Sequence, residues 1–201
     1  MNRRMMALAV LLMSSLPFAP NGRGQTKNQK GQTSIYQDSD GYEVLSVLLN
    51  AVSVVRKNDT IRIDPRTAPG KYVAEMKAQC SGIPAEFQSA SEDFDKKVKT
   101  RLILRRGFSL RKNYELAYGS ATAGISQPET KEEARKRIRS GIYHVAAVGF
   151  DDKRTHAVAF MEYICGNLCG DSIFYFLRKS EKGWEEAREV QREVQRCGRI
   201  Y

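Results

Sequence analysis

The sequence predicts an α+β fold, in which N-terminal helices pack on a C-terminal antiparallel β-meander. Three observations support this prediction. In the first half of the chain, apolar residues recur every three or four positions, which is the spacing of a helix face. After residue 141, β-branched and aromatic residues gather in short runs separated by turn-forming residues. The 201 residues, of which 41 % are hydrophobic, suffice for one domain with its own core.

The first helix is predicted after two N-cap candidates, Ser39 and Asp40. Its apolar stripe consists of Val44, Leu45, Leu48, Leu49 and Val52. Residues 60–63 then alternate β-branched and polar side chains and run into an Asp-Pro pair. This alternation predicts a short strand.

A second helix is predicted after Pro84. Apolar residues keep helical spacing there through Phe87, Ala90, Phe94, Val98 and Leu102. Acidic residues come early in this segment and basic residues late, as the helix dipole favours. The basic run 96–106 has two interpretations, a patch that binds polyanions or a solvated helix end, and we favour the helix end.

The remaining elements are expected mostly as strands. Residues 114–118 predict a strand, and the charged residues 130–138 predict a short helix. The meander comprises a strand at 142–150, a turn at 151–154, a return strand at 155–164 and a third strand at 173–177. A turn at 180–183 leads to Trp184, beyond which helical spacing through residue 197 favours a strand that gives way to helix. We expect the helices to cover one face of the sheet.

Residues 1–24 have the layout of a secretory signal peptide. Two arginines precede an apolar core at 7–19, which is shorter than the about 20 residues of a membrane-spanning helix. Small residues favour cleavage before Gln25, and a retained membrane anchor is the alternative. We therefore expect a protein exported to the periplasm or the extracellular space. Residues 25–40 would be a flexible lead-in and 41–201 a single domain without a transmembrane segment.

The charge balance favours acidic partners or a soluble basic surface. Three of the 33 basic residues and none of the 23 acidic residues lie in residues 1–24, so removal of that segment lowers the net charge from +10 to +7. Such a surplus can attract anionic lipid, polysaccharide or nucleic acid. Because bases and acids are interleaved, we favour an ordinary soluble surface.

Export changes the interpretation of the four cysteines. An even number in an oxidising compartment predicts disulfides among Cys165, Cys169, Cys80 and Cys197. Three pairings are possible, and the short Cys-Gly-Asn-Leu-Cys-Gly run favours a local bridge between the two middle cysteines. The other two cysteines would then close a loop of over a hundred residues, worth about 4–5 kcal/mol. Zinc is the alternative, but His144 and His156 lack paired ligand spacing, and C-x-x-x-C is not the redox spacing.

The last third of the chain contains a series of short motifs: Val148-Gly149-Phe150, residues 151–157, Cys165-Gly166-x-Leu168-Cys169-Gly170, Leu177-x-Lys179 and Gly183-Trp184. Together these motifs resemble a family of uncharacterised secreted bacterial proteins. With the elements around Tyr42, Thr60 and Glu92, the resemblance covers most of the chain after residue 40, although only the Cys-Gly run is distinctive. It implies export and architecture and no activity. In element order alone the chain is also similar to the cone-shaped fold of nuclear transport factor two, whose curved sheet often encloses a small-ligand pocket.

No catalytic motif stands out. The sequence holds no Gly-x-Ser-x-Gly elbow, phosphate loop or His-Glu-x-x-His motif, and we expect no catalytic residue, cofactor or metal. Asp151 and Asp152 are expected to form a turn. Glu162 would be an acid–base candidate if it pointed inward, but we favour an outward, solvated side chain. The two histidines are expected to be structural or at the surface.

The function predicted from sequence is therefore that of a secreted, non-catalytic binding or interaction module. Its partner would be an envelope protein or an anionic polymer, and no specific nucleic-acid binding is expected. Two alternatives stay open. One is a small pocket enzyme, a hydrolase or isomerase, on a cone-like sheet. The other is a basic protein that adheres to an anionic envelope polymer.

Overall fold

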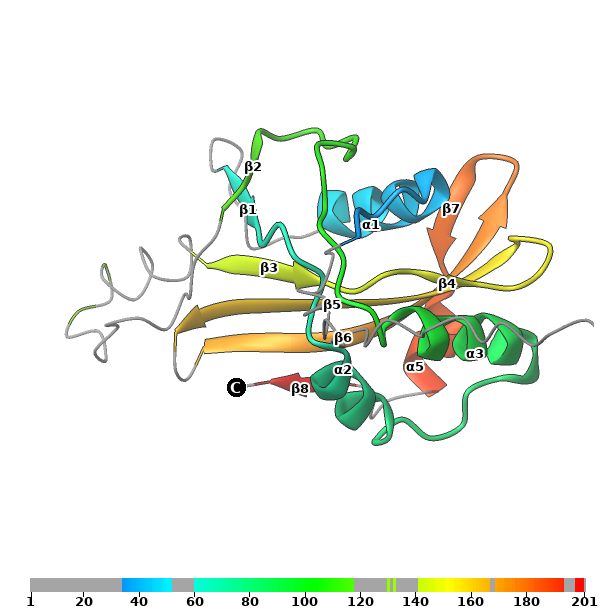
Figure 1. The fold of residues 1–201 in the computed structure, drawn as a ribbon. Coiled ribbons are helices and arrows are strands. Elements are labelled where there is room, and N and C mark those ends of the chain that lie inside the picture. The colour runs from blue at the N-terminus through cyan, green and yellow to red at the C-terminus, as the bar shows by residue number, and fades with distance from the viewer. Residues whose placement is uncertain are drawn as a thin grey trace, which may run out of the picture. The chain divides into compact units, whose positions relative to one another are not determined.

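Eight strands in the described part of the chain form one mixed sheet (Figure 1). The structure is a computed structural model that describes residues 34–51, 60–117, 130, 132, 141–166, 169–193 and 198–200. Along the sheet the order is β2-β1-β3-β5-β6-β7, with β4 paired to β5 and β8 paired to β6. At one edge, β1 (Ile61–Ile63) runs parallel to both β2 (Tyr114–Leu116) and β3 (Ile142–Val145).

The rest of the sheet is an antiparallel meander. It comprises β4 (Gly149–Phe150), β5 (His156–Gly166), β6 (Cys169–Ser180), β7 (Gly183–Glu186) and β8 (Gly198–Ile200). The turn into β7 depends on Gly183, whose φ of 105° is a conformation that side chains rarely adopt. The predicted α+β class with a C-terminal antiparallel meander is confirmed, and the sheet curls into a half-barrel.

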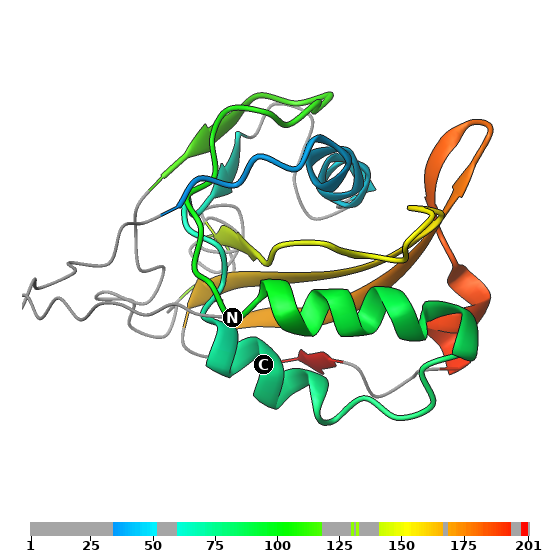
Figure 2. The same cartoon turned by 45° about the vertical axis from the view of Figure 1, so that its right-hand side comes forward.

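Helices lie on both faces of this sheet, as Figure 2 shows. They are α1 (Ser39–Ala51), α2 (Gly70–Lys77), α3 (Gln88–Lys97), which continues the short 3-10 turn η1 (Ala85–Phe87), and α5 (Arg188–Glu193). α1 covers one face, while α2 and α3 cover the other. The expectation that helices cover a single face is wrong.

The central strand β5 explains why both faces need a cover. Successive side chains of a strand point to opposite faces. Ala159 and Tyr163 pack into the cluster that holds Leu45 of α1, whereas Val158 and Phe160 pack into a second cluster under α2 and α3. Since both sets are apolar and buried, a helix layer on one side alone would leave the other set in water.

After α3 the chain runs as an irregular strap over residues 98–113, which the sequence had assigned in part to the helix. α3 ends at Lys97 instead of continuing to Leu102. Beyond it, the Leu102 N–H donates to Thr67 Oγ1 (2.9 Å), and the Ile103 N–H donates to the Ser34 carbonyl (2.9 Å). Tertiary partners thus take the amide hydrogens that a longer helix would have used.

Other elements agree with the sequence to different degrees. The predicted first helix, the strand near residue 61 and the helix after Trp184 are present. The predicted strand 142–150 is interrupted between β3 and β4, and α2 and β8 were not anticipated. Residues 34–40 belong to the domain, because Ile35 pairs with Ile103 and Tyr36 is buried in the core. The predicted signal peptide, and all but residues 130 and 132 of the predicted helix 130–138, lie outside the described residues.

Candidate functional site

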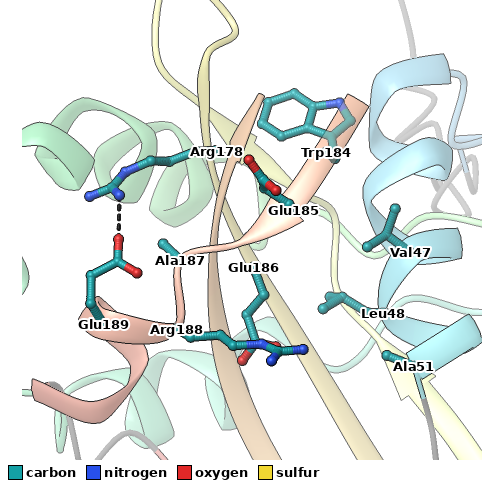
Figure 3. A pocket seen from close by; sticks show the side chains of 10 residues that line it. All are labelled: Val47, Leu48, Ala51, Arg178, Trp184, Glu185, Glu186, Ala187, Arg188 and Glu189. Carbon is teal, nitrogen blue, oxygen red and sulfur yellow. Dashed lines mark hydrogen bonds and ion pairs between the residues drawn. The ribbon is translucent and has the colours of Figure 1, made fainter. Parts of the chain in front are cut away.

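A cleft of about 510 Å³ lies between helix α1 and the segment that joins β7 to α5 (Figure 3). Its apolar wall consists of Val47, Leu48 and Ala51, whose spacing places them on one side of α1. The other wall comes from Trp184 and residues 185–189. A concave site with an apolar wall and a few polar groups at its edge is the usual form of a small-ligand site.

Trp184, the single tryptophan of the chain, forms part of the cleft wall. Its side chain is only 6 % exposed, packs on Phe150 with ring centroids 5.4 Å apart, and has Lys179 Nζ 5.4 Å from its ring centre. The indole nitrogen lies on the ring edge nearer α1 (Figure 3) and donates to no described residue. A buried donor without an acceptor is destabilising.

The charged residues at the rim of the cleft include more acids than bases, although the protein as a whole is basic. Arg178 is already paired with Glu189. Glu185, Glu186 and Arg188 complete the rim, and none of them has an ion-pair partner in the part of the chain that the structure describes. The unpaired part of the rim therefore carries two carboxylates against one guanidinium. Such a rim favours a basic group beside the apolar wall.

A second group of polar side chains crosses the sheet beneath α2. His144, Glu162 and Ser172 lie opposite one another on β3, β5 and β6, so their side chains share a face. Tyr72 of α2 donates to Glu162 Oε1 (2.5 Å), and Ser172 Oγ donates to the same oxygen (3.0 Å). The two hydroxyl oxygens lie 3.0 Å apart. We call Tyr72, His144, Glu162 and Ser172 the polar row.

His144 connects the polar row to Asp64, which follows β1. The His144 Nδ1 lies 3.8 Å from Asp64 Oδ2. Burial lowers the pKa of His144 against the opposing fields of Asp64 and Glu162, so the imidazole is neutral at pH 7. Burial by itself would raise the pKa of Asp64, but hydrogen bonds from the side chain and backbone of Arg66 hold that pKa below its ordinary value.

Glu162 points inward, contrary to the outward position that we favoured from sequence. It is 7 % exposed and shares a sheet face with Val158 and Phe160, because the three alternate along β5. An inward carboxylate can act as a general base. Here, however, Ser172 gives its hydrogen bond to Glu162 and not to His144. The polar row therefore lacks the serine–histidine contact of a nucleophilic triad.

Asp151 and Asp152 belong to the turn between β4 and β5, as predicted, and His156 is the first residue of β5. Asp151 Oδ1 accepts the N–H groups of Thr155 (2.6 Å) and His156 (2.8 Å), and the His156 Nδ1 lies 3.3 Å from Asp151 Oδ2. Burial would raise the pKa of Asp151, but these hydrogen bonds lower it overall. Asp152 is exposed. The contacts of the two aspartates are those of turn-forming residues.

Two of the four candidate disulfide cysteines have described side chains. Cys165 is buried in the cluster beneath α1, whereas Cys80 packs at the margin of the cluster on the other face of the sheet. Neither is a free thiol. The side chains of Cys169 and Cys197 lie outside the described residues. The pairing of the four cysteines therefore stays a prediction.

Sequence reasoning missed both the cleft and the polar row. Only periodicity could have indicated them. Val47 and Ala51 lie one helical turn apart, and Glu162 and Ser172 lie within apolar strand segments. Their neighbours come from distant parts of the chain, so no local pattern connects Tyr72 with Glu162 or Val47 with Trp184.

Comparison of the chain with protein-family models, with curated proteins and with solved structures gives no match. Among the described residues, no helix is both long and apolar enough to cross a membrane. Within the same ranges, no three histidine, cysteine or acidic side chains converge as ligands for a metal ion.

Proposed function

We propose that this protein is an exported, non-catalytic binding module whose ligand occupies the cleft between α1 and β7. The observation that carries the proposal is the cleft itself, in which Trp184 lies across from the apolar side of α1 formed by Val47, Leu48 and Ala51. Aromatic side chains of this kind supply much of the binding energy at protein recognition sites. The apolar wall and the acidic rim select an amphipathic ligand with a basic group.

Each part of the ligand has a counterpart in the cleft. An apolar group would lie against Val47, Ala51 and the indole ring, since these surfaces line the cleft from opposite sides. A neighbouring ammonium or guanidinium group would lie towards Glu185 and Glu186. Short peptide segments with an aliphatic and a basic residue combine these features.

Fluorescence titration tests this proposal directly, because Trp184 is the only tryptophan. We expect an acetylated and amidated Leu-Leu-Arg peptide to change the emission of the mature protein in a saturable way. A Leu-Leu-Glu peptide should bind at least tenfold more weakly. Saturable binding of neither peptide, or tighter binding of the acidic one, contradicts the proposed ligand class.

A pair of variants locates the binding site. Ala51 is exposed at the end of α1, and Ala51→Arg would occupy the cleft entrance with a bulky cation. Ala74 is exposed on α2, so Ala74→Arg makes the same chemical change far from the cleft. We expect Ala51→Arg to weaken peptide binding at least tenfold and Ala74→Arg to leave it within twofold. Equal effects of the two variants would place the ligand elsewhere.

Export and disulfide formation are part of the proposal. They are supported by the charged and apolar layout of residues 1–24 and by the absence of free thiols at Cys80 and Cys165. We expect the bridges Cys165–Cys169 and Cys80–Cys197. Mass spectrometry of the secreted protein, with and without reductant, should give an N-terminus at residue 25 and a mass gain of four hydrogens on reduction. An intact N-terminus with four free thiols would contradict this part.

A small pocket enzyme is the second candidate, and the inward carboxylate of Glu162 favours it. The polar row brings a carboxylate, two hydroxyls and an imidazole together on one face of the sheet. Glu162→Gln keeps the size of the side chain and removes its charge. If the secreted protein hydrolyses or isomerises any member of a substrate panel, loss of that activity in Glu162→Gln with retained peptide binding would identify the polar row as a catalytic site.

A further inference from the structure

The strap that follows α3 carries an unbroken series of positive charges. Between Asp95 and Glu115 the chain contains eight basic residues and no acidic one. Six of them lie on the strap itself, Lys99, Arg101, Arg105, Arg106, Arg111 and Lys112. We call residues 99–112 the basic strap.

Side chains of α1 hold the backbone of the basic strap in place. Tyr42, Ser46 and Asn50 follow one another at four-residue intervals on α1. The Tyr42 hydroxyl accepts the Arg105 N–H (2.8 Å), Ser46 Oγ accepts the Ser109 N–H (2.9 Å), and Asn50 Oδ1 accepts the Arg111 N–H (2.8 Å). The strap is therefore clamped along its length, because three successive turns of one helix bind its amides.

The three hydrogen bonds from α1 also fix which side chains of the strap face solvent. Leu104 and Phe108 are 2 % and 7 % exposed and belong to the core beneath α1. Arg105, Arg106 and Arg111 lie between or after them and are exposed. The apolar residues thus anchor the strap, and the guanidinium groups are presented to solvent.

Four of the six basic residues of the strap are exposed and have no ion pair within the described part of the chain. Lys99, Arg105, Arg106 and Arg111 have no ion pair there, and Arg101 donates only to the Thr67 carbonyl. Four arginines elsewhere are paired with carboxylates, in Arg62–Glu115, Arg66–Asp64, Arg154–Asp38 and Arg178–Glu86, although Arg188 is not paired within the described residues. A surface that keeps its arginines unpaired attracts external anions more strongly than one with interleaved acids.

We propose that the basic strap binds a linear acidic polysaccharide, with repeated sulfate or carboxylate groups along the row of cations. The six basic residues follow one another within 14 residues of backbone that α1 holds in place, so their charges repeat along the strap as anionic groups repeat along a polysaccharide. Its apolar residues face the core, so they offer nothing for insertion into a bilayer. The strap meets α1 through Tyr42, Ser46 and Asn50, whereas the cleft uses Val47, Leu48 and Ala51, so the two sites are separate.

Charge reversal on and off the strap tests this binding site in the mature protein. Arg105→Glu/Arg106→Glu and the control Lys153→Glu/Lys182→Glu each lower the net charge by four, and all four positions are exposed. With heparin as the probe, we expect the strap variant to lose at least tenfold in affinity and the control to stay within twofold. Arg105→Ala/Arg106→Ala should show an intermediate loss, and its binding should depend less steeply on salt. Since the clamp uses only backbone groups of the strap, the variants should melt like the parent.

Three outcomes would overturn the proposal. Equal losses in the strap and control variants would show that overall charge, and not the strap, attracts heparin. Tighter binding to phosphatidylglycerol vesicles than to heparin would indicate a membrane surface. Displacement of heparin by single-stranded DNA at a lower charge concentration would indicate nucleic acid. Ala51→Arg, the variant that blocks the cleft, should retain full heparin binding. The heparin result can therefore fail or succeed independently of peptide binding in the cleft.

Discussion

The hydroxyl of Tyr72 should be a measurable support for the packing of α2 on the sheet. Among the described residues it makes two contacts that phenylalanine cannot make, a 2.5 Å hydrogen bond to Glu162 Oε1 and a 3.0 Å contact with Ser172 Oγ. Tyr72→Phe removes that single oxygen and keeps the ring, which packs edge-on against Phe160 at 6.2 Å. The variant therefore tests the polar contact without opening a cavity.

The stability that Tyr72→Phe is expected to lose depends on whether the hydrogen-bond acceptor, Glu162, is charged. A hydrogen bond to a charged group contributes about 1.5–3 kcal/mol, against about 0.5–1.5 kcal/mol for a neutral pair. Glu162 is 7 % exposed and keeps only the Ser172 donor after the change, so water cannot readily replace the lost hydroxyl. We expect Tyr72→Phe to lower the free energy of unfolding by about 2 kcal/mol, equivalent to a melting point about 4–8 °C lower.

Urea denaturation followed by Trp184 fluorescence measures this change, with Tyr114→Phe as the control. Tyr114 also packs edge-on against a phenylalanine, Phe108 at 5.6 Å, but its hydroxyl has no hydrogen bond to a described residue. The control should change stability by less than about 0.5 kcal/mol. In a Glu162→Gln background, Tyr72→Phe should cost less than about 1.5 kcal/mol, because the acceptor is then neutral. If Tyr72→Phe matches Tyr114→Phe in the unmodified background, the hydroxyl does not stabilise α2.

Three further perturbations give defined outcomes in the same assay. Gly149→Ala should destabilise by about 3 kcal/mol or more, because its Cβ would lie 2.3 Å from the backbone atoms Ala90 O and Phe94 N; an unchanged midpoint would show that α3 can shift freely. Burial raises the pKa of Asp171, so the protonated carboxyl contributes stability at low pH, and this contribution is lost as pH rises through the folded-state pKa. Asp171→Asn should therefore be more stable than the parent at pH 7 and equal to it below pH 3.8, the ordinary pKa. A stability difference that stays constant with pH would argue against this titration. Burial lowers the pKa of His144, so below pH 6.5, its ordinary pKa, the unfolded state takes up a proton more readily and stability should fall. His144→Gln should reduce this fall. Parallel pH profiles of the stability of parent and variant would contradict the prediction.

Local patterns predicted those elements whose buried side chains are contiguous in sequence. The stripe through Leu45 and Leu49 predicted α1, and the β-rich runs predicted β5 and β6. The turn at Asp151 was also predicted, since its side chain bonds amides only four and five residues away. In each case the decisive interaction spans a few residues, so a short window of sequence contains it.

Errors occurred where distant partners outweighed local preference. The helix after Pro84 was extended to Leu102, yet it ends at Lys97 because the amides of the following segment are bound by Thr67, Pro65 and α1. The eight-residue helix α2 has a weak apolar stripe, with Val73 and Met76 as its buried apolar residues, and was missed. Glu162 was expected to face water because carboxylates usually do. Its inward position depends on the hydroxyls of Tyr72 and Ser172, which are 90 and 10 residues away.

The sequence by itself determined the α+β class, the C-terminal meander and the basic charge, because these depend on composition and on short-range periodicity. Only the tertiary structure decided that helices cover both faces of the sheet and that Trp184 lines a cleft against α1. It also placed Glu162 within a buried row of hydroxyls and clamped the basic strap along one helix. Each of these features joins segments far apart in the chain. Such contacts form when the two faces of β5 are both removed from water, and no local pattern encodes which distant segment supplies the cover.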